Sequence, residues 1–221
     1  MIMREERRQL IDYGRQLIDR GLTKGTGGNL SVWEPKRHLM AITPSGIPYE
    51  VIRENEIVLI DVETGRIVDG DALPSSEVDM HRIFYKYRQD LQALIHTHST
   101  FAATLACQRL DLPAVHYLVA YAGINVRCAD YATYGTVELA RKAFEAMEER
   151  KACLLANHGL LAGGADLEEA FNVAEEIEFC CELYCRVKSM GEPVILDEEE
   201  MVRMLDRFKD YGKKAELHES I

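Results

Sequence analysis

The sequence predicts an α/β fold, in which strands and helices alternate along a chain of 221 residues. Three observations support this class. Short apolar runs typical of strands are interleaved with longer amphipathic segments typical of helices. Hydrophobic residues make up 47% of the chain, enough to bury a full core. No low-complexity linker, internal repeat or shift in composition divides the sequence, so residues 1–221 are expected to form a single domain.

The N-terminal part predicts one helix followed by three strands. The helix ends near Gly21 and is indicated by four apolar residues with helical spacing: Leu10, Ile11, Leu17 and Ile18. A glycine-rich loop then leads into a strand over residues 29–33. Two further strands are expected at residues 39–42 and 57–60, where turn signals bound the apolar runs.

The middle of the chain predicts a helix, a strand and a second helix. Ser76 and Asp79 have the spacing of a capping box, which predicts a helix over residues 76–88. Residues 91–98 read as a strand, and residues 100–107 as a short helix.

The C-terminal part predicts three helices and one strand. Residues 135–150 are expected to be helical, and the apolar run 153–156 has the pattern of a central strand. Asp166 is expected to cap the longest helix, and a last helix covers about residues 197–210. The longest helix carries a continuous apolar stripe: Leu167, Ala170, Phe171, Ala174, Ile177, Cys181, Tyr184 and Cys185. The sequence does not determine the strand order.

Composition excludes several classes of function. The net charge of −11 and the lack of a basic stripe argue against nucleic-acid binding. No apolar run approaches the ~18 residues of a membrane span, and no signal peptide precedes the first helix. The six cysteines show no disulfide framework, so we expect free thiols in a reducing cytoplasm. A metal cluster of Cys180, Cys181 and Cys185 is the less favoured alternative.

Three histidines indicate a metal site. His96 and His98 flank one residue behind an apolar run, and in a strand such side chains point to the same side, about 6–7 Å apart along the backbone. His158 follows another apolar run, and Glu77 adds a carboxylate. A lone histidine is more often a core or turn residue. Three histidines with a spare carboxylate predict a catalytic zinc site, although iron, nickel or copper also suit imidazole.

Glu77 has two equally supported interpretations. At the start of a predicted helix it can complement the helix dipole. Beside a metal it can act as a general base.

Three small-residue loops are candidates for binding phosphate through amides and hydroxyls. They are residues 27–29, 43–46 and 75–76. Each loop alone is more often an ordinary turn or cap, and none matches a nucleotide P-loop.

Taken together, these segments resemble the class II (zinc-dependent) sugar-phosphate aldolase/epimerase family, and above all its L-fuculose-1-phosphate aldolase branch. The resemblance covers nearly the whole chain in order. It rests on residues 21–31, on Ile42-Thr43-Pro44-Ser45-Gly46-Ile47-Pro48-Tyr49, on Leu73-Pro74-Ser75-Ser76-Glu77, on His96-Thr97-His98, and on residues 113–117, 131–136, 157–160 and 208–212.

The resemblance implies a three-layer α/β/α domain around a mainly antiparallel sheet. It implies a four-fold symmetric homotetramer with active sites at subunit interfaces. One zinc ion per subunit, or another divalent metal, would be held by His96, His98 and His158.

The resemblance also implies roles for the remaining residues. Substrate phosphate would be bound by Gly28, Asn29, Ser45, Gly46, Ser75 and Ser76. Glu77 would be the acid/base residue, Tyr117 of a neighbouring subunit the proton donor, and Tyr211 a residue on a mobile tail near the site. Gly27 and Ser45 replace similar small residues of the family, which bears on fine specificity.

The activity implied is that of a metal-dependent aldolase in carbohydrate metabolism. It would reversibly cleave a ketose 1-phosphate, such as L-fuculose 1-phosphate, to dihydroxyacetone phosphate and a short aldehyde. The alternatives on the same scaffold are a 5-deoxypentulose-1-phosphate aldolase, an L-ribulose-5-phosphate 4-epimerase and a methylthioribulose-1-phosphate dehydratase. A non-enzymatic interaction module is disfavoured, because the chain carries all three histidines and Glu77.

Overall fold

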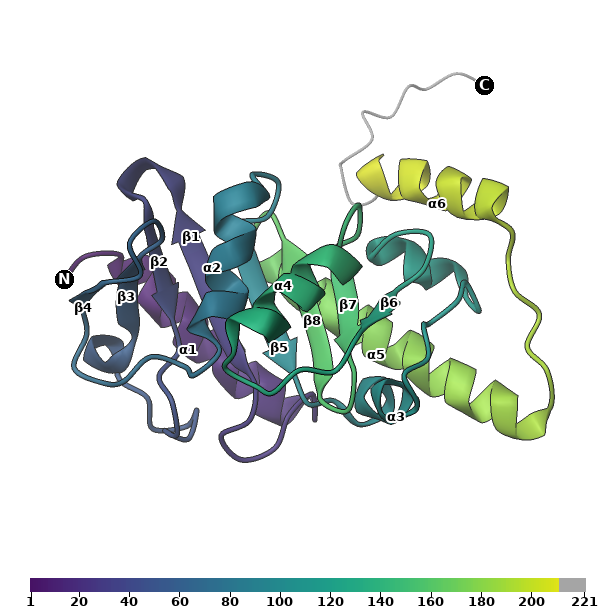
Figure 1. Cartoon of the computed structure of the whole chain (residues 1–221), viewed down its shortest axis with the longest axis horizontal. Coiled ribbons are helices and arrows are strands. Elements are labelled where there is room, and N and C mark those ends of the chain that lie inside the picture. Colours follow the sequence, from purple (N-terminus) through teal and green to yellow (C-terminus); the bar gives the residue numbers. More distant parts are fainter. Residues whose placement is uncertain (211–221) are drawn as a thin grey trace, which may run out of the picture.

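A computed structural model describes residues 1–210, and it confirms the α/β class (Figure 1). One sheet of eight strands has the order β4-β3-β2-β1-β5-β8-β7-β6. Within the described residues, β6 and β7 are parallel and the other neighbouring pairs are antiparallel, which confirms a mainly antiparallel sheet. The strands are β1 (Asn29–Glu34), β2 (Leu39–Ile42), β3 (Val58–Asp61), β4 (Ile67–Asp69), β5 (Ala93–Thr97), β6 (Arg127–Ala129), β7 (Ala152–Leu155) and β8 (Gly159–Gly164).

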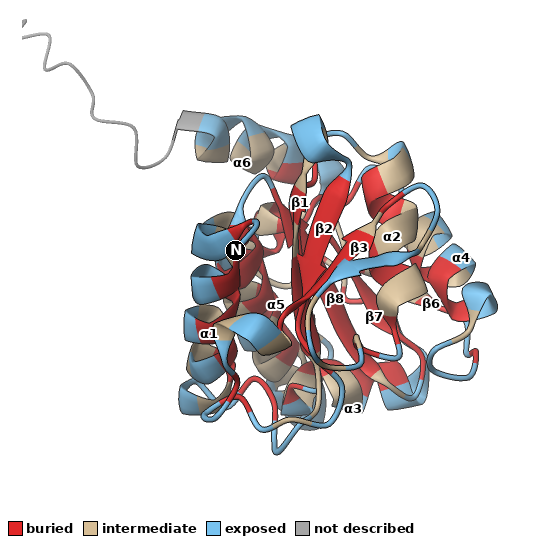
Figure 2. Ribbon diagram, turned by 90° about the vertical axis from the view of Figure 1, so that its left-hand side faces the viewer, coloured by how far each residue is buried: buried red, intermediate tan, exposed pale blue. Residues whose placement is uncertain are grey.

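Helices cover both faces of the sheet and complete the three layers. Helices α2 and α4 lie over one face, and α1, α3 and α5 cover the other (Figures 1 and 2). The last helix, α6, packs against the short 3-10 helix η3. The helices are α1 (Arg4–Asp19), α2 (Val78–Tyr87), α3 (Thr100–Gln108), α4 (Val137–Ala146), α5 (Leu167–Met190) and α6 (Glu198–Asp210), with 3-10 helices η1 (Pro35–Arg37), η2 (Glu54–Glu56) and η3 (Tyr117–Tyr121).

Strand side chains alternate between two apolar cores, one under each helical layer. In β1, Leu30 and Val32 pack into the core beneath α1 and α5, whereas Trp33 packs into the core beneath α2 and α4. Residues i and i+2 of a strand face the same way, so Asn29 and Ser31 share the α2 side with Trp33. Figure 2 shows the central strands buried and the helices exposing their outer surfaces. The strand next to the centre of the sheet therefore presents two polar residues to α2.

Two predicted helices have different ends in the structure. The predicted capping box of Ser76 and Asp79 is not formed, because Glu77 occupies the N-cap position of α2 and its side chain makes no capping hydrogen bond. The backbone N–H of Glu77 instead donates to Ser75 Oγ at 3.2 Å. Helix α4 is shorter than predicted, since Thr136 caps it by accepting from the Leu139 N–H. The cap predicted at Asp166 is confirmed by a 2.8 Å bond from the Glu169 N–H.

The sequence patterns missed three strands. Strands β4 and β6 have three residues each and lie at the two edges of the sheet, too short for a periodic signal. Strand β8 begins and ends with glycines, which read as a loop. The prediction that β7 is central is wrong, because it lies one strand from the edge. Its apolar run reflects burial on both faces of the sheet. The helical layers bury a strand next to the edge as fully as they bury a central one.

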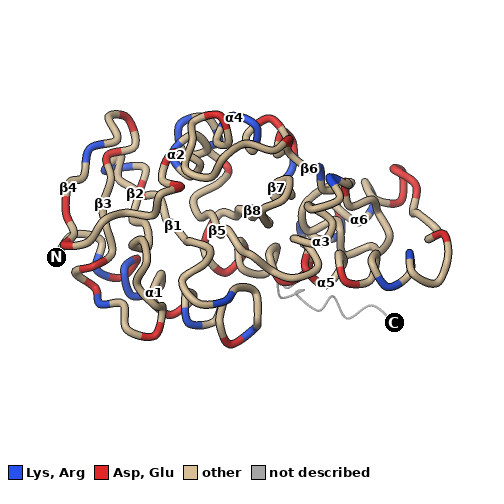
Figure 3. The backbone as a smooth tube through the Cα atoms, turned by 60° about the horizontal axis from the view of Figure 1, so that its bottom comes forward, with Lys and Arg blue, Asp and Glu red and all other residues tan. Residues whose placement is uncertain are grey.

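Other expectations concern surface and termini. Acidic and basic residues alternate over the outer helices and loops, while β5, β7 and β8 carry neither (Figure 3). Among the described residues, no helix is both long and apolar enough to cross a membrane. All six cysteines are free thiols. Tyr211 lies outside the described residues, and the single-domain expectation for residues 1–221 stays a prediction.

Candidate active site

The three histidines predicted as metal ligands converge at the end of β5. His96 is the fourth residue of β5, His98 follows the strand, and His158 lies in the turn between β7 and β8. Because β5 pairs with β8 in a register that sets Thr97 opposite Leu160, this turn lies beside the end of β5. One nitrogen atom from each of the three rings lies within 4.8 Å of the others.

Two glycines permit this close approach of the loops. A Cβ at Gly159 would lie 2.2 Å from the carbonyl oxygen of Thr97, which no side chain tolerates. Gly28 has a φ of +74°, and a Cβ there would lie 2.5 Å from the carbonyl oxygen of His96. The lack of a side chain at these two glycines therefore lets the glycine-rich loop and the turn that carries His158 pack directly against the end of β5, where His96 and His98 are located.

The donor set fits a divalent cation. His96 Nδ1 lies 2.9 Å from the carbonyl oxygen of Leu160, and since a carbonyl only accepts, this nitrogen carries the proton. His96 Nε2 then holds a lone pair, and it lies 2.9 Å from His98 Nε2. Burial lowers the pKa of His96 well below its usual range and also lowers the pKa of His98, so both rings are kept neutral, as metal ligands must be. Converging imidazole lone pairs repel each other unless a cation or a proton lies between them.

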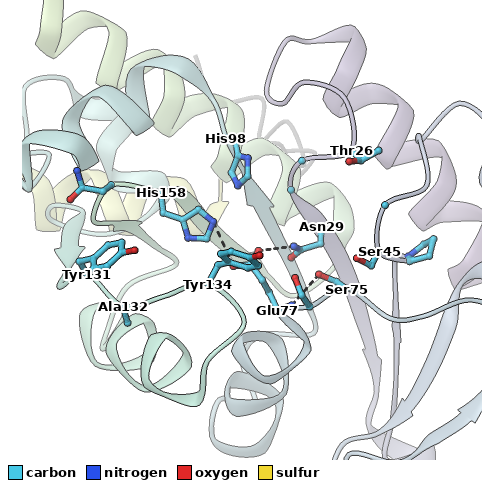
Figure 4. A pocket seen from close by; sticks show the side chains of 16 residues that line it. Thr26, Asn29, Ser45, Ser75, Glu77, His98, Tyr131, Ala132, Tyr134 and His158 are labelled. Carbon is cyan, nitrogen blue, oxygen red and sulfur yellow. Dashed lines mark hydrogen bonds and ion pairs between the residues drawn. The ribbon is translucent and has the colours of Figure 1, made fainter.

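Glu77 lies directly beside the histidines. Its Oε2 accepts a hydrogen bond from Asn29 Nδ2 at 2.9 Å and lies 3.3 Å from His96 Nε2. Its Oε1 is buried without a hydrogen-bond partner and lies 3.6 Å from His158 Nε2 (Figure 4). An unpartnered buried carboxylate oxygen is costly for a fold. The Glu77 side chain makes no capping hydrogen bond to α2, and its Oε1 is left free to accept a proton.

The three candidate phosphate loops line one cavity with these groups. The cavity has a volume of about 370 Å³, within the range of small-molecule sites. A bridge between Pro44 and Pro74 joins two of the loops, with Ser45 N–H donating to Leu73 and Ser75 N–H donating to Thr43. All six predicted phosphate residues are lining residues: Gly28, Asn29, Ser45, Gly46, Ser75 and Ser76. Figure 4 places Ser45 and Ser75 across the cavity from His98 and His158.

Among residues 1–210, neither lysine nor arginine lines the cavity. A phosphate bound there would be held by hydroxyls, amides and the N-terminal end of α2, which begins directly after Ser75, Ser76 and Glu77.

One predicted catalytic residue, Tyr117, does not line this cavity within its own chain. Tyr117 lies in η3 with 45% of its surface exposed, and its ring packs against His116 at 4.6 Å between centroids. Tyr211 lies outside the described residues.

Five lining residues received no role from the sequence. Tyr131 and Tyr134 form part of the cavity wall and are half or more exposed, and the others are Thr26, Ala132 and Asn157. The two tyrosines lie in the segment 131–136, which carries the family resemblance but offered no chemistry beyond its aromatic rings. An aromatic pair in a loop without helical or strand periodicity is the signal that could have marked this segment as a binding surface.

Comparison with known proteins gives this geometry a context. Residues 8–185 match the family model described as Class II Aldolase and Adducin N-terminal domain. The 5-deoxy-D-ribulose 1-phosphate aldolase of Bacillus thuringiensis serovar kurstaki is 49% identical over 214 residues, covering 97% of this chain and 100% of that protein. The 5-methylthioribulose-1-phosphate/5-deoxyribulose-1-phosphate aldolase of Rhodospirillum rubrum is 47% identical over 212 residues, covering 96% of this chain and 94% of that protein.

A solved structure agrees with these relatives. The protein described as L-fuculose 1-phosphate aldolase superimposes with a TM-score of 0.93 at 54% identity, covering 95% of this chain and 98% of its own. The likeness therefore extends over nearly the whole chain and is not confined to one motif.

Proposed function

The chain belongs to the class II aldolase and adducin N-terminal domain family and is an aldolase, and we propose that it reversibly cleaves a ketose 1-phosphate to dihydroxyacetone phosphate and a short aldehyde. L-fuculose 1-phosphate and 5-deoxy-D-ribulose 1-phosphate are both candidate substrates, because relatives named for each sugar match nearly the whole chain. The three relatives above are all named as aldolases, which favours this reaction over epimerisation or dehydration.

One observation carries the proposal. A single cavity has His98, His158 and an unpartnered Glu77 oxygen on one side, with the buried His96 next to Glu77, and the small polar loops of Ser45 and Ser75 on the other. A sugar phosphate has the matching polarity, with a dianion at one end and carbonyl and hydroxyl oxygens next to it. A non-catalytic interaction module has no use for such an arrangement.

The proposed metal is zinc, held by His96, His98 and His158. When bound, the cation supplies Lewis-acid stabilisation of negative charge on the substrate oxygens.

The chain's own residues perform the remaining steps. The loops of Ser45 and Ser75 bind the phosphate and so position the reacting carbon. Glu77 Oε1, the carboxylate oxygen without a partner, removes a proton from the hydroxymethyl carbon of dihydroxyacetone phosphate. The carbanion attacks the aldehyde, and Tyr117 of a neighbouring subunit protonates the new alkoxide. Cleavage follows the same path in reverse, with Glu77 returning the proton.

The proposal includes a homotetramer in the cytoplasm. Tyr117 lies exposed on η3, away from the cavity of its own chain, which is the placement that a residue serving a neighbouring site requires. The six free thiols suit a reducing compartment.

Deuterium exchange into dihydroxyacetone phosphate in heavy water tests the proposal, because it reports proton removal without the correct aldehyde. We expect stereospecific exchange that a chelator abolishes and added zinc restores. A panel of lactaldehyde, acetaldehyde and glycolaldehyde then identifies the sugar by condensation rate. Absence of exchange in metal-loaded protein would contradict the aldolase assignment, and exchange that survives chelation would contradict the metal-dependent mechanism.

A further inference from the structure

A chain of buried hydrogen bonds extends from Glu77 into the interface between α2 and β1. Asn29 donates from Nδ2 to Glu77 Oε2 at 2.9 Å, and its Oδ1 lies 2.5 Å from His81 Nε2. On the other side of the ring, His81 Nδ1 lies 2.6 Å from Ser31 Oγ, which in turn lies 2.5 Å from the hydroxyl of Tyr85. All five side chains are at most 5% exposed.

The two elements bring these groups together by simple periodicity. Glu77, His81 and Tyr85 are spaced by four residues and form one stripe on α2. Asn29 and Ser31 are two apart on β1 and point to the same face. The side chains interleave, so that each strand residue contacts two neighbours on the helix, and Trp33 continues the row by stacking on Tyr85 with ring centroids 5.7 Å apart.

The direction of every bond along the chain follows from its first member. A carboxylate only accepts, so Asn29 must turn its amide nitrogen toward Glu77 and its oxygen toward His81. His81 must then carry its proton on Nε2, and its Nδ1 must accept from the Ser31 hydroxyl. Burial lowers the pKa of His81 to about 3, so the ring is neutral and has one N–H to give. If the Asn29 amide were flipped, its Oδ1 would face Glu77 Oε2, and two hydrogen-bond acceptors would lie in contact.

Packing alone does not require this arrangement. An interface of apolar residues with the same shape would stabilise the contact of α2 with β1 about as well, because a net hydrogen bond contributes only about 1 kcal/mol. What the polar chain adds is a fixed orientation at its Glu77 end, where Oε2 is held and Oε1 is left free.

We propose that His81 is a positioning residue for the reaction: through Asn29 it locks the Glu77 carboxylate with Oε2 occupied and Oε1 presented to the substrate. This inference rests on the proposed function of Glu77 as the base. It also gives the Asn29 side chain a role in orienting Glu77, separate from the phosphate contact that the family resemblance implies.

The test compares three variants in the full-length, metal-loaded enzyme. His81→Leu removes the donor to Asn29, His81→Gln keeps an N–H in the place of Nε2, and Tyr85→Phe is a control at the far end of the chain. We expect His81→Leu to lower kcat for deuterium exchange about 10- to 100-fold, as loss of a supporting hydrogen bond does, with KM for dihydroxyacetone phosphate nearly unchanged. His81→Gln should regain most of kcat, and Tyr85→Phe should remain within about twofold of wild type.

Several results would overturn the inference. His81→Leu could show the wild-type kcat, or it could show a change in KM alone. His81→Gln could also prove as slow as His81→Leu at equal metal content. If His81→Leu does not fold, nitrogen NMR of the histidine-labelled wild-type protein decides: a protonated Nε2 and an unprotonated Nδ1 at His81 support the inference, and the other tautomer ends it. The NMR result does not depend on turnover. A wild-type enzyme that shows no exchange would contradict the proposed function instead.

Discussion

Replacing Glu77 by glutamine should remove most proton transfer while leaving the fold and the metal site in place. The carbonyl oxygen of the glutamine can still accept the hydrogen bond from Asn29 that Oε2 accepts in the wild type, at 2.9 Å. The amide nitrogen then occupies the place of Oε1, where it has no lone pair to receive a proton. The change in the free energy of unfolding should stay within about 1 kcal/mol, because the interface loses no hydrogen bond.

The magnitude follows from the role of the group. General acid/base catalysis by a positioned side chain contributes about 10²- to 10⁴-fold, which corresponds to about 2.7–5.4 kcal/mol of activation free energy. We therefore expect Glu77→Gln to lower kcat for deuterium exchange by at least about 100-fold. The proposed zinc ligands are the three converging histidine rings, and Glu77 is not among them. The zinc content of Glu77→Gln should therefore equal that of the wild type.

The assay measures exchange into dihydroxyacetone phosphate by NMR, with zinc content and thermal unfolding recorded on the same sample. Glu138→Gln is the matched control, since Glu138 is exposed on α4 and pairs with Lys142 across one helical turn. A Glu77→Gln enzyme that keeps more than about a tenth of the wild-type exchange rate would refute the proposed base, because general acid/base catalysis contributes at least about 100-fold.

Three further predictions follow from the same geometry. His96→Ala should lose bound metal, and full occupancy measured by elemental analysis would remove His96 from the ligand set. Tyr117→Phe should retain deuterium exchange but lose condensation with aldehydes, and equal loss of both activities would contradict its role as donor to the aldehyde oxygen. Burial lowers the pKa of His81 in the folded state to about 3, below the usual histidine value of about 6.5, so the unfolded state takes up a proton first as pH falls; the free energy of unfolding should drop by about 2 kcal/mol between pH 7 and pH 5 from this group. Denaturant titrations at both pH values should show a smaller drop in His81→Leu, and an unchanged drop would show that His81 is not the source.

Part of the metal centre could be predicted from the sequence because it depends on local geometry alone. The two-residue spacing of His96 and His98 fixes their common direction in any strand. The position of His158 depends instead on the pairing of β5 with β8, which joins segments more than sixty residues apart. Strand β8 had no periodic signal, so His158 was connected with the pair only by the apolar run that precedes it and by the family resemblance.

His81, in contrast, is a residue whose place beside the site could not be predicted from the sequence. On its own it is a histidine in an amphipathic helix, where a buried, hydrogen-bonded core residue is the ordinary interpretation. Its role becomes visible only once Glu77, His81 and Tyr85 on α2 are aligned with Asn29 and Ser31 on β1. That alignment depends on which face of the sheet α2 covers, and periodicity within either segment does not specify it. Tyr117 is a further case, because its proposed site lies on a neighbouring subunit, and the pattern of a single chain does not show contacts between subunits.

The placement of α2 affects how phosphate binding positions the reacting carbon of the substrate. Ser75 and Ser76 closely precede this helix, Glu77 is its N-cap, and His81 follows one turn later. In the proposed mechanism, the phosphate-binding serines, the base and the residue that positions the base therefore follow one another along a single short segment. A phosphate bound by the serines therefore sets the position of the substrate relative to Glu77 Oε1 through a few covalent bonds, rather than through a flexible loop. The binding energy of the phosphate, which is remote from the reacting carbon, is in this way used to orient the carbon that loses its proton.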